Sequence, residues 1–155
     1  MNDYPKDVNS NTMGNYLELE KLAKEGRKFL SIFMKSSRLN NTRGLCLYGS
    51  WLVKELVTNF TPHTATIRGG DGEGDGGYYH SLLSRWFGHY WVEVATDGGT
   101  FLIDITGDQF SGGSPVLVAH IEEPPARYYA PGNQSTVDEH CEILLDEIKR
   151  CVVTH

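Results

Sequence analysis

The stretch GHYWVEVATDGGTFLIDITGDQF, from Gly88 to Phe110, constrains the fold of this chain more than any other part of the sequence. It contains two runs rich in aromatic and β-branched residues, and the turn-forming sequence TDGG lies between them. This arrangement is typical of two antiparallel strands joined by a tight turn. We expect the two strands at His89 to Ala95 and at Thr100 to Ile105.

The length of the turn decides which side chains share a face of this hairpin. A turn of two or of four residues within TDGG places Thr100 opposite Ala95. Asp104 then lies opposite Trp91, and it becomes the diagonal neighbour of His89 on the same face, with Cβ atoms about 7–8 Å apart. A turn of three residues would place the two side chains on opposite faces. An even turn therefore predicts an imidazole within reach of a carboxylate.

The rest of the chain shows helical patterns at both ends and extended patterns in the middle. Helices are expected at 11–36, at 46–57 and at 137–152, and further strands at 64–68 and 115–121. Thr136 and Glu139 fit a capping box at the start of the last helix, and the polar residues 1–12 are expected to form a frayed leader. With 155 residues, the chain is expected to form a single domain. The fold class that follows is α+β, with N-terminal helices packed on a central antiparallel sheet and a C-terminal helix.

A glycine-rich segment, Gly69 to Gly77, precedes the hairpin. Its composition disfavours helix and strand interiors, so we expect a flexible loop or a mobile lid near the site. Residues 71–76, DGEGDG, match the first half of an EF-hand calcium loop. Leu82, however, stands where that loop requires a glutamate, and no metal site is expected.

The three cysteines differ in their surroundings. No CxxC pair occurs, which argues against a zinc ribbon and a disulfide scaffold, and favours a reducing cytoplasmic location. Cys141 and Cys151 fall inside the expected last helix, where buried cysteines act as small hydrophobic residues. Cys46 falls in the first turn of the second helix, and a helix N-terminus favours a thiolate. Cys46 is therefore the candidate nucleophile.

A carboxylate on one ring nitrogen of a histidine fixes its tautomer and leaves the other nitrogen free to move a proton. A cysteine needs less activation than a serine, and no GxSxG motif is present to suggest a serine nucleophile. We therefore predict that Cys46, His89 and Asp104 are catalytic, with Asp108 as the alternative to Asp104. Candidates for an oxyanion donor or a pocket wall are Trp91, Tyr90 and Trp51.

These residues, in this order, resemble the transglutaminase-like branch of the papain-like superfamily of cysteine enzymes. The matching pieces are Cys46 in RGLCLYGSWLVKEL, the strand HYWVEV that begins at His89, and Asp104 in FLIDIT. The resemblance covers Leu45 to about Asp108. It implies a papain- or transglutaminase-like fold, a Cys–His–Asp triad, no cofactor, and thioester chemistry on an amide bond of a peptide or protein. A peptidase, a deamidase and a transglutaminase-like enzyme all fit this description.

Charge and hydropathy weigh against other classes of function. The formal net charge of −6 argues against a nucleic-acid or anionic-membrane binder, and no apolar run is long enough for a spanning helix. The N-terminal residues lack the apolar core of a secretory signal. The remaining alternative to an enzyme is a catalytically silent binding or regulatory module that keeps the fold.

Overall fold

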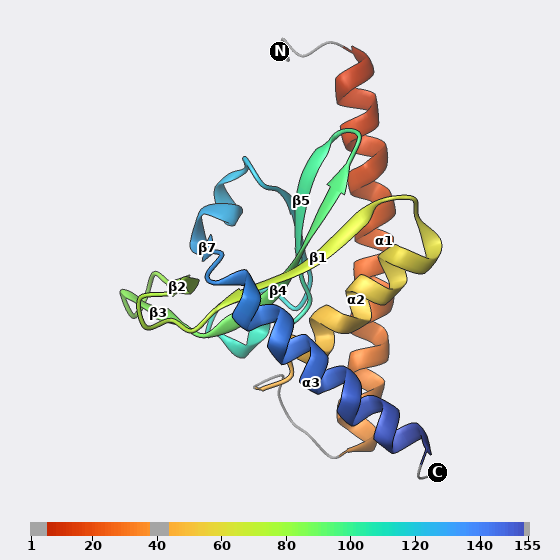
Figure 1. Ribbon diagram of the computed structural model, residues 1–155. Helices are drawn as coiled ribbons and strands as arrows, with labels where there is room; N and C mark the ends of the chain where they lie inside the picture. The colour runs from red at the N-terminus through yellow and green to blue at the C-terminus, as the bar shows by residue number, and fades with distance from the viewer. Residues whose placement is uncertain (1–5, 38–43, 154–155) are drawn as a thin grey trace.

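The computed structural model describes the backbone of residues 6–37 and 44–153, and the side chains of 11–37 and 44–150. Within these ranges it has an α+β fold with three α-helices and two antiparallel sheets (Figure 1). The α-helices are α1 (Lys6–Ser36), α2 (Cys46–Phe60) and α3 (Gln134–Val153). The main sheet has the order β1 (Thr64–Gly70), β4 (His89–Thr96), β5 (Gly99–Asp104) and β6 (Leu117–His120).

The second sheet has the order β3 (Arg85–Phe87), β2 (Gly77–His80) and β7 (Tyr129–Ala130). Two short 3-10 helices, η1 (Gly107–Gln109) and η2 (Pro124–Tyr128), connect the later strands. In Figure 1 this second sheet lies on the left and α1 on the right, with the main sheet between them. None of the described helices combines the length and the apolar character needed to cross a membrane.

The β4–β5 hairpin has the register that an even turn predicts. Thr96 pairs with Gly99 and Ala95 with Thr100, so the turn consists of two residues, Asp97 and Gly98. Gly99 has a φ of +115°, a conformation that glycine adopts without strain.

Helix α1 holds the tip of this hairpin in place. The side-chain amide of Asn15 donates hydrogen bonds to the carboxylate of Asp97 at 2.8 Å and to the hydroxyl of Thr96 at 3.0 Å. Thr12 donates a longer bond, 3.4 Å, to the carbonyl of Gly98. The contact between α1 and the turn is visible at the upper end of α1 in Figure 1. These contacts fix the turn length that sets the register.

The two faces of the hairpin enter two different cores. Alternate residues of β4 and β5, such as Val92, Val94 and Phe101, are buried in the larger core together with apolar side chains of α1 and α2. On the other face Trp91 and Leu102 are buried together with an alanine of η2. His89 and Asp104 lie on this second face, beneath η2 and the second sheet.

The first helix is longer than expected. It begins at Lys6, so residues 6–12, which we expected to belong to a frayed leader, are helical; residues 1–5 lie outside the described part. Gly26, in the middle of α1, lies against α2, and a Cβ atom there would be 3.4 Å from Leu56 and 3.5 Å from Val53. Gly26 thus lies at the contact between the two helices, where a Cβ atom would stand at ordinary contact distance.

The glycine-rich segment is a packed part of the fold rather than the flexible loop that we expected. Its ends belong to β1 and β2, and only residues 71–76 connect them. Gly69 accepts a hydrogen bond of 2.7 Å from the amide of Gly132. The carboxylate of Asp75 accepts one from the amide of Asn133 at 3.1 Å. The segment thereby fastens the start of α3 to the main sheet.

Helix α3 begins three residues earlier than expected, and its cap differs from the predicted capping box. The side-chain oxygen of Asn133 accepts the hydrogen bond of the Thr136 amide at 3.1 Å, which is the role of an N-cap residue. Thr136 is thus inside the helix. Both residue types favour helix starts, so the pattern alone did not separate them.

Candidate active site

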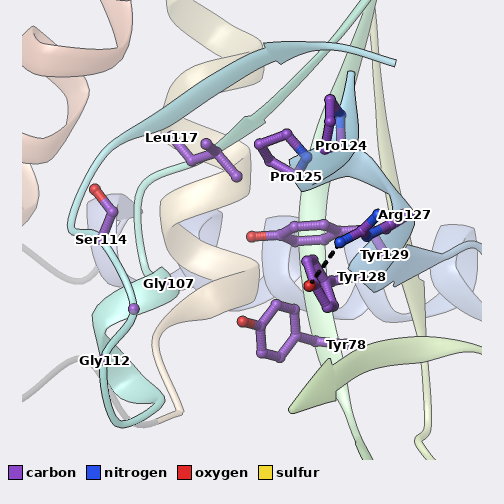
Figure 2. Close-up of a pocket in the computed structure, with 11 residues that line it drawn as sticks. Tyr78, Gly107, Gly112, Ser114, Leu117, Pro124, Pro125, Arg127, Tyr128 and Tyr129 are labelled. Atoms are coloured by element: carbon purple, nitrogen blue, oxygen red, sulfur yellow. Dashed lines mark hydrogen bonds between the residues drawn. The ribbon is translucent and has the colours of Figure 1, made fainter. Parts of the chain in front are cut away.

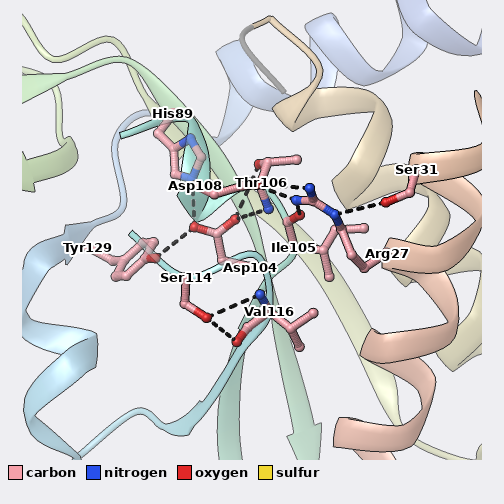
Figure 3. A network of polar contacts seen from close by, with 10 residues as sticks. All are labelled: Arg27, Ser31, His89, Asp104, Ile105, Thr106, Asp108, Ser114, Val116 and Tyr129. Carbon is pink, nitrogen blue, oxygen red and sulfur yellow. Dashed lines mark hydrogen bonds and ion pairs between the residues drawn. The ribbon is translucent and has the colours of Figure 1, made fainter. Parts of the chain in front are cut away.

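His89 and Asp104 form a buried pair where β4 begins and β5 ends. The Nε2 atom of His89 lies 2.7 Å from Oδ2 of Asp104, and the two residues are 1% and 2% exposed (Figure 3). The hairpin register brings them together, because Asp104 follows the pair Val92–Ile103 and faces the same side as His89.

Asp104 is held as a carboxylate by donors on both oxygens. Tyr129 donates to Oδ2 at 2.7 Å, and Thr106 donates to Oδ1 from its amide at 2.9 Å and from its hydroxyl at 3.3 Å. Burial by itself raises the pKa of a carboxyl group. The charge of His89 and these hydrogen bonds outweigh that effect and hold the pKa of Asp104 below its usual range.

The imidazole of His89 is influenced by Cys46 as well as by Asp104. Burial lowers the pKa of His89, but the charge and hydrogen bond of Asp104, together with the nearby Cys46, raise it to about 10. Nδ1 is buried and makes no hydrogen bond of good geometry with the described residues.

Cys46 is the first residue of α2, as expected. The preceding residue, Leu45, occupies the N-cap position and its side chain caps no amide there. The first amides of a helix have no acceptor within the helix, so the N–H groups around Cys46 are available to an external oxyanion. Cys46 is partly buried.

Asp108 has a different partner. Its two carboxylate oxygens accept hydrogen bonds from Arg27 of α1 at 2.7 and 2.8 Å, and Arg27 also donates to the carbonyl of Ile105 at 2.9 Å (Figure 3). Asp108 therefore fastens η1 to α1, while Asp104 contacts the histidine.

The three candidate aromatic residues lie in three places. Trp91 is fully buried, with its ring centroid 6.2 Å from that of His89, so it forms a wall behind the imidazole. Tyr90 points to the opposite face, where its hydroxyl contacts Nδ1 of His140; burial and the nearby Cys46 raise the pKa of Tyr90. Trp51 lines an apolar groove between α1 and α2.

The structure adds residues that the sequence pattern did not single out. Tyr129 contacts Asp104 from β7, and the ring of Phe110 packs edge-on against His89 with centroids 5.1 Å apart. No local motif marks Tyr129, because its contact with Asp104 depends on pairing of a two-residue strand in the second sheet.

Two cavities lie beside the buried pair. One, of about 380 Å³, is lined by Tyr78, Tyr129, Arg127 and Ser114, and the tyrosine rings point into it (Figure 2). The other, of about 390 Å³, is lined by residues that include His80, Phe87, Gly88, Gln109 and Phe110. Neither of these two cavities has Cys46, His89 or Asp104 in its lining. Both are large enough for a substrate side chain.

The part of the chain that the structure describes contains no group of three or more histidine, cysteine, aspartate or glutamate side chains that could hold a metal ion. The carboxylates of the glycine-rich segment are instead used in local bonds, and Asp71 accepts the amide of Glu73 at 2.7 Å. Cys141 packs against the large core, and burial raises the pKa of its thiol. The side chain of Cys151 lies outside the described residues.

Comparisons with protein-family models, with curated proteins and with solved structures found no match to this chain.

Proposed function

We propose that this chain is a cysteine-dependent amide enzyme, a peptidase, deamidase or transglutaminase-like acyltransferase, that acts through a thioester on Cys46. The observation that carries the proposal is the buried imidazole of His89, whose Nε2 atom lies 2.7 Å from Asp104 and whose pKa is raised by Asp104 together with the nearby Cys46. An acid, a base and a thiol at a helix start are the parts that nucleophilic catalysis by cysteine requires.

The first half of the reaction uses the thiolate. In the first step His89 accepts the proton of the Cys46 thiol, and the buried hydrogen bond to Asp104 supports the positive charge that the ring then carries. The sulfur attacks the carbonyl carbon, a C–S bond forms, and the carbonyl oxygen becomes an oxyanion near the first amides of α2. The intermediate then collapses, the C–N bond breaks, and His89 gives its proton to the leaving amine.

The second half discharges the thioester. Water or an amine attacks the thioester carbonyl, His89 accepts the proton of this nucleophile, and the C–S bond breaks. An acid or a new amide leaves, and the proton on His89 again balances the Cys46 thiolate. Throughout, Asp104 stays ionised and orients the ring.

The same proposal includes a papain- or transglutaminase-like fold and a peptide or protein substrate in the cytoplasm. A cysteine on a helix followed by a histidine and an aspartate on neighbouring antiparallel strands supports it.

Alkylation of the thiols by iodoacetamide tests the proposal without knowledge of the substrate. Cys46 should react at neutral pH at least about tenfold faster than Cys141, whose burial raises the pKa of its thiol. Mass spectrometry of the two cysteine peptides measures both rates in one sample. His89→Ala should slow Cys46 to the rate of an ordinary thiol and leave Cys141 unchanged. Equal rates for both cysteines in the unaltered protein would contradict the proposal.

A catalytically silent binding module is the second candidate. The observation in its favour is the near-complete burial of His89 and Asp104, since an ion pair sealed from water also serves structure alone. Slow labelling of Cys46 together with a stable fold would favour this candidate.

A further inference from the structure

Tyr129 is the part of the site that the enzyme proposal does not yet use. We infer that Tyr129 is a positioning residue that keeps Asp104 ionised and oriented beneath His89. This inference deepens the proposed function and rests on it for its catalytic meaning. The contact itself is a property of the fold.

The hydroxyl of Tyr129 and the imidazole of His89 share one oxygen. Both lie 2.7 Å from Oδ2 of Asp104, and the two reach it from different sides, His89 from above and Tyr129 from the left in Figure 3. A Cβ atom on Gly107 would stand 3.4 Å from the same oxygen, so the glycine backbone closes a further side. With Thr106 on the other oxygen, donors surround the carboxylate and its plane is fixed.

The ring of Tyr129 is itself held rigidly. Its centroid lies 5.2 Å from that of Trp91 and 5.1 Å from that of Tyr78, both in edge-on contacts. Tyr129 belongs to β7, and Asp104 belongs to β5 of the main sheet. The hydrogen bond between Tyr129 and Asp104 thus joins the two sheets. The ring of Tyr129 also forms one wall of the cavity in Figure 2.

The side chains that face Asp104 favour Tyr129 as the hydrogen-bond donor to its ionised carboxylate. Tyr129 remains a donor because burial and the charge of Asp104 raise the pKa of its hydroxyl well above its usual range. Tyr78 approaches from β2, and burial and the same charge raise its pKa too. His89 approaches from β4, with its Nε2 atom 2.7 Å from Oδ2. Without the Tyr129 hydroxyl, burial would raise the pKa of Asp104, because burial opposes ionisation and one donor would be lost.

The test compares Tyr129→Phe with Tyr128→Phe. Tyr128 is a matched control, because its hydroxyl accepts a hydrogen bond from Arg127 at 3.2 Å, whereas the tyrosine hydroxyl that donates to Asp104 is that of Tyr129. Proton NMR follows the low-field signal of the His89 Nε2–H as pH falls, since this signal is lost when Asp104 takes up a proton. Tyr129→Phe should raise the pH at which the signal is lost by about one to two units. This shift corresponds to the free energy of one hydrogen bond to a charged group. Tyr128→Phe should leave it in place.

The same shift should appear in the acid limb of the Cys46 alkylation profile. If the His89 Nε2–H signal of Tyr129→Phe is lost at the same pH as in the unaltered protein, the inference is wrong. Should that variant fail to fold, a tyrosine fluorinated ortho to its hydroxyl at position 129 keeps the ring and donates more strongly. This stronger donor should weaken the hydrogen bond between His89 and Oδ2 of Asp104, and so move the Nε2–H signal to higher field. A signal that does not move would overturn the inference. Slow Cys46 alkylation combined with these NMR shifts would refute the proposed function and leave the role of Tyr129 standing.

Discussion

Replacement of Asp104 by asparagine removes the charge of the buried pair and keeps the shape of the side chain. Asparagine still accepts the Thr106 amide, but its neutral group no longer stabilises the imidazolium of His89. We place the change in a Cys46→Ser background, so that the thiol no longer contributes to the pKa of His89. Burial then dominates, and the pKa of His89 should fall below its ordinary value.

The magnitude follows from the pair itself. Asp104 and Cys46 together raise the pKa of His89 from 6.5 to about 10 against the effect of burial, and at about 1.4 kcal/mol per pKa unit this corresponds to about 5 kcal/mol. Removal of one partner from a buried ion pair generally costs about 3–5 kcal/mol. We expect Asp104→Asn to lower the free energy of unfolding by about 3–5 kcal/mol near neutral pH, which a domain of this size can survive.

The pH dependence has a defined sign. The raised pKa of His89 gives stability that is complete below 6.5 and lost as pH rises through about 10. The lowered pKa of Asp104 gives stability that is complete above 3.8 and lost as pH falls through its value in the folded protein. In Asp104→Asn the buried His89 resists protonation, so this variant should lose stability as pH falls below 6.5, where the parent does not.

Urea unfolding, followed by circular dichroism at several pH values, measures this difference. Asp108→Asn is the matched control: its pair with Arg27 is partly exposed, and its loss should cost about 1 kcal/mol or less. A cost below about 1 kcal/mol for Asp104→Asn, or parallel pH curves for variant and parent, would refute the reasoning.

Three further changes test the packing around the site by thermal and urea unfolding. Gly26→Ala should raise the free energy of unfolding by about 0.5–1 kcal/mol, because a Cβ atom fits at ordinary contact distance and alanine favours helix; a loss would show that the helices cannot accept it. Gly74 and Gly76 both have positive φ, but only at Gly76 would a Cβ atom strike neighbouring backbone, so Gly76→Ala should cost clearly more than the roughly 1 kcal/mol expected for Gly74→Ala. Asn133→Ala should lower the free energy of unfolding by about 1 kcal/mol, because Asn133 caps α3. A larger loss for Thr136→Ala would show that Thr136 is the cap instead.

The parts of the fold that local patterns predicted are those whose evidence lies within a short segment. The TDGG turn and the alternation around it predicted Asp104 beside His89 on the condition that the turn has an even number of residues, and the two-residue turn of the structure meets that condition. The helix start at Cys46 was also predicted from its neighbours. A pairing between adjacent strands is thus readable from sequence when the turn is unambiguous.

The second sheet could not be predicted in this way. Its strands have four, three and two residues, and β7 is a strand only because it pairs with β2 from about fifty residues away. The contact of Tyr129 with Asp104 depends on that pairing, so it was missed along with the sheet. The glycine-rich segment was misjudged for a similar reason: its glycines allow the close approach of residues 130–133, and composition alone does not distinguish that from flexibility.

The order in which the site assembles follows from the chain separations of its members. His89 and Asp104 are 15 residues apart and joined by a two-residue turn, and such hairpins close within about 1–10 µs. Cys46 precedes His89 by 43 residues and reaches it only after α2 docks on β4, a contact of longer range that forms more slowly. A nascent or partly unfolded chain should therefore form the His89–Asp104 pair before Cys46 comes near it. The reactivity of the Cys46 thiol toward electrophiles should then report that folding is complete.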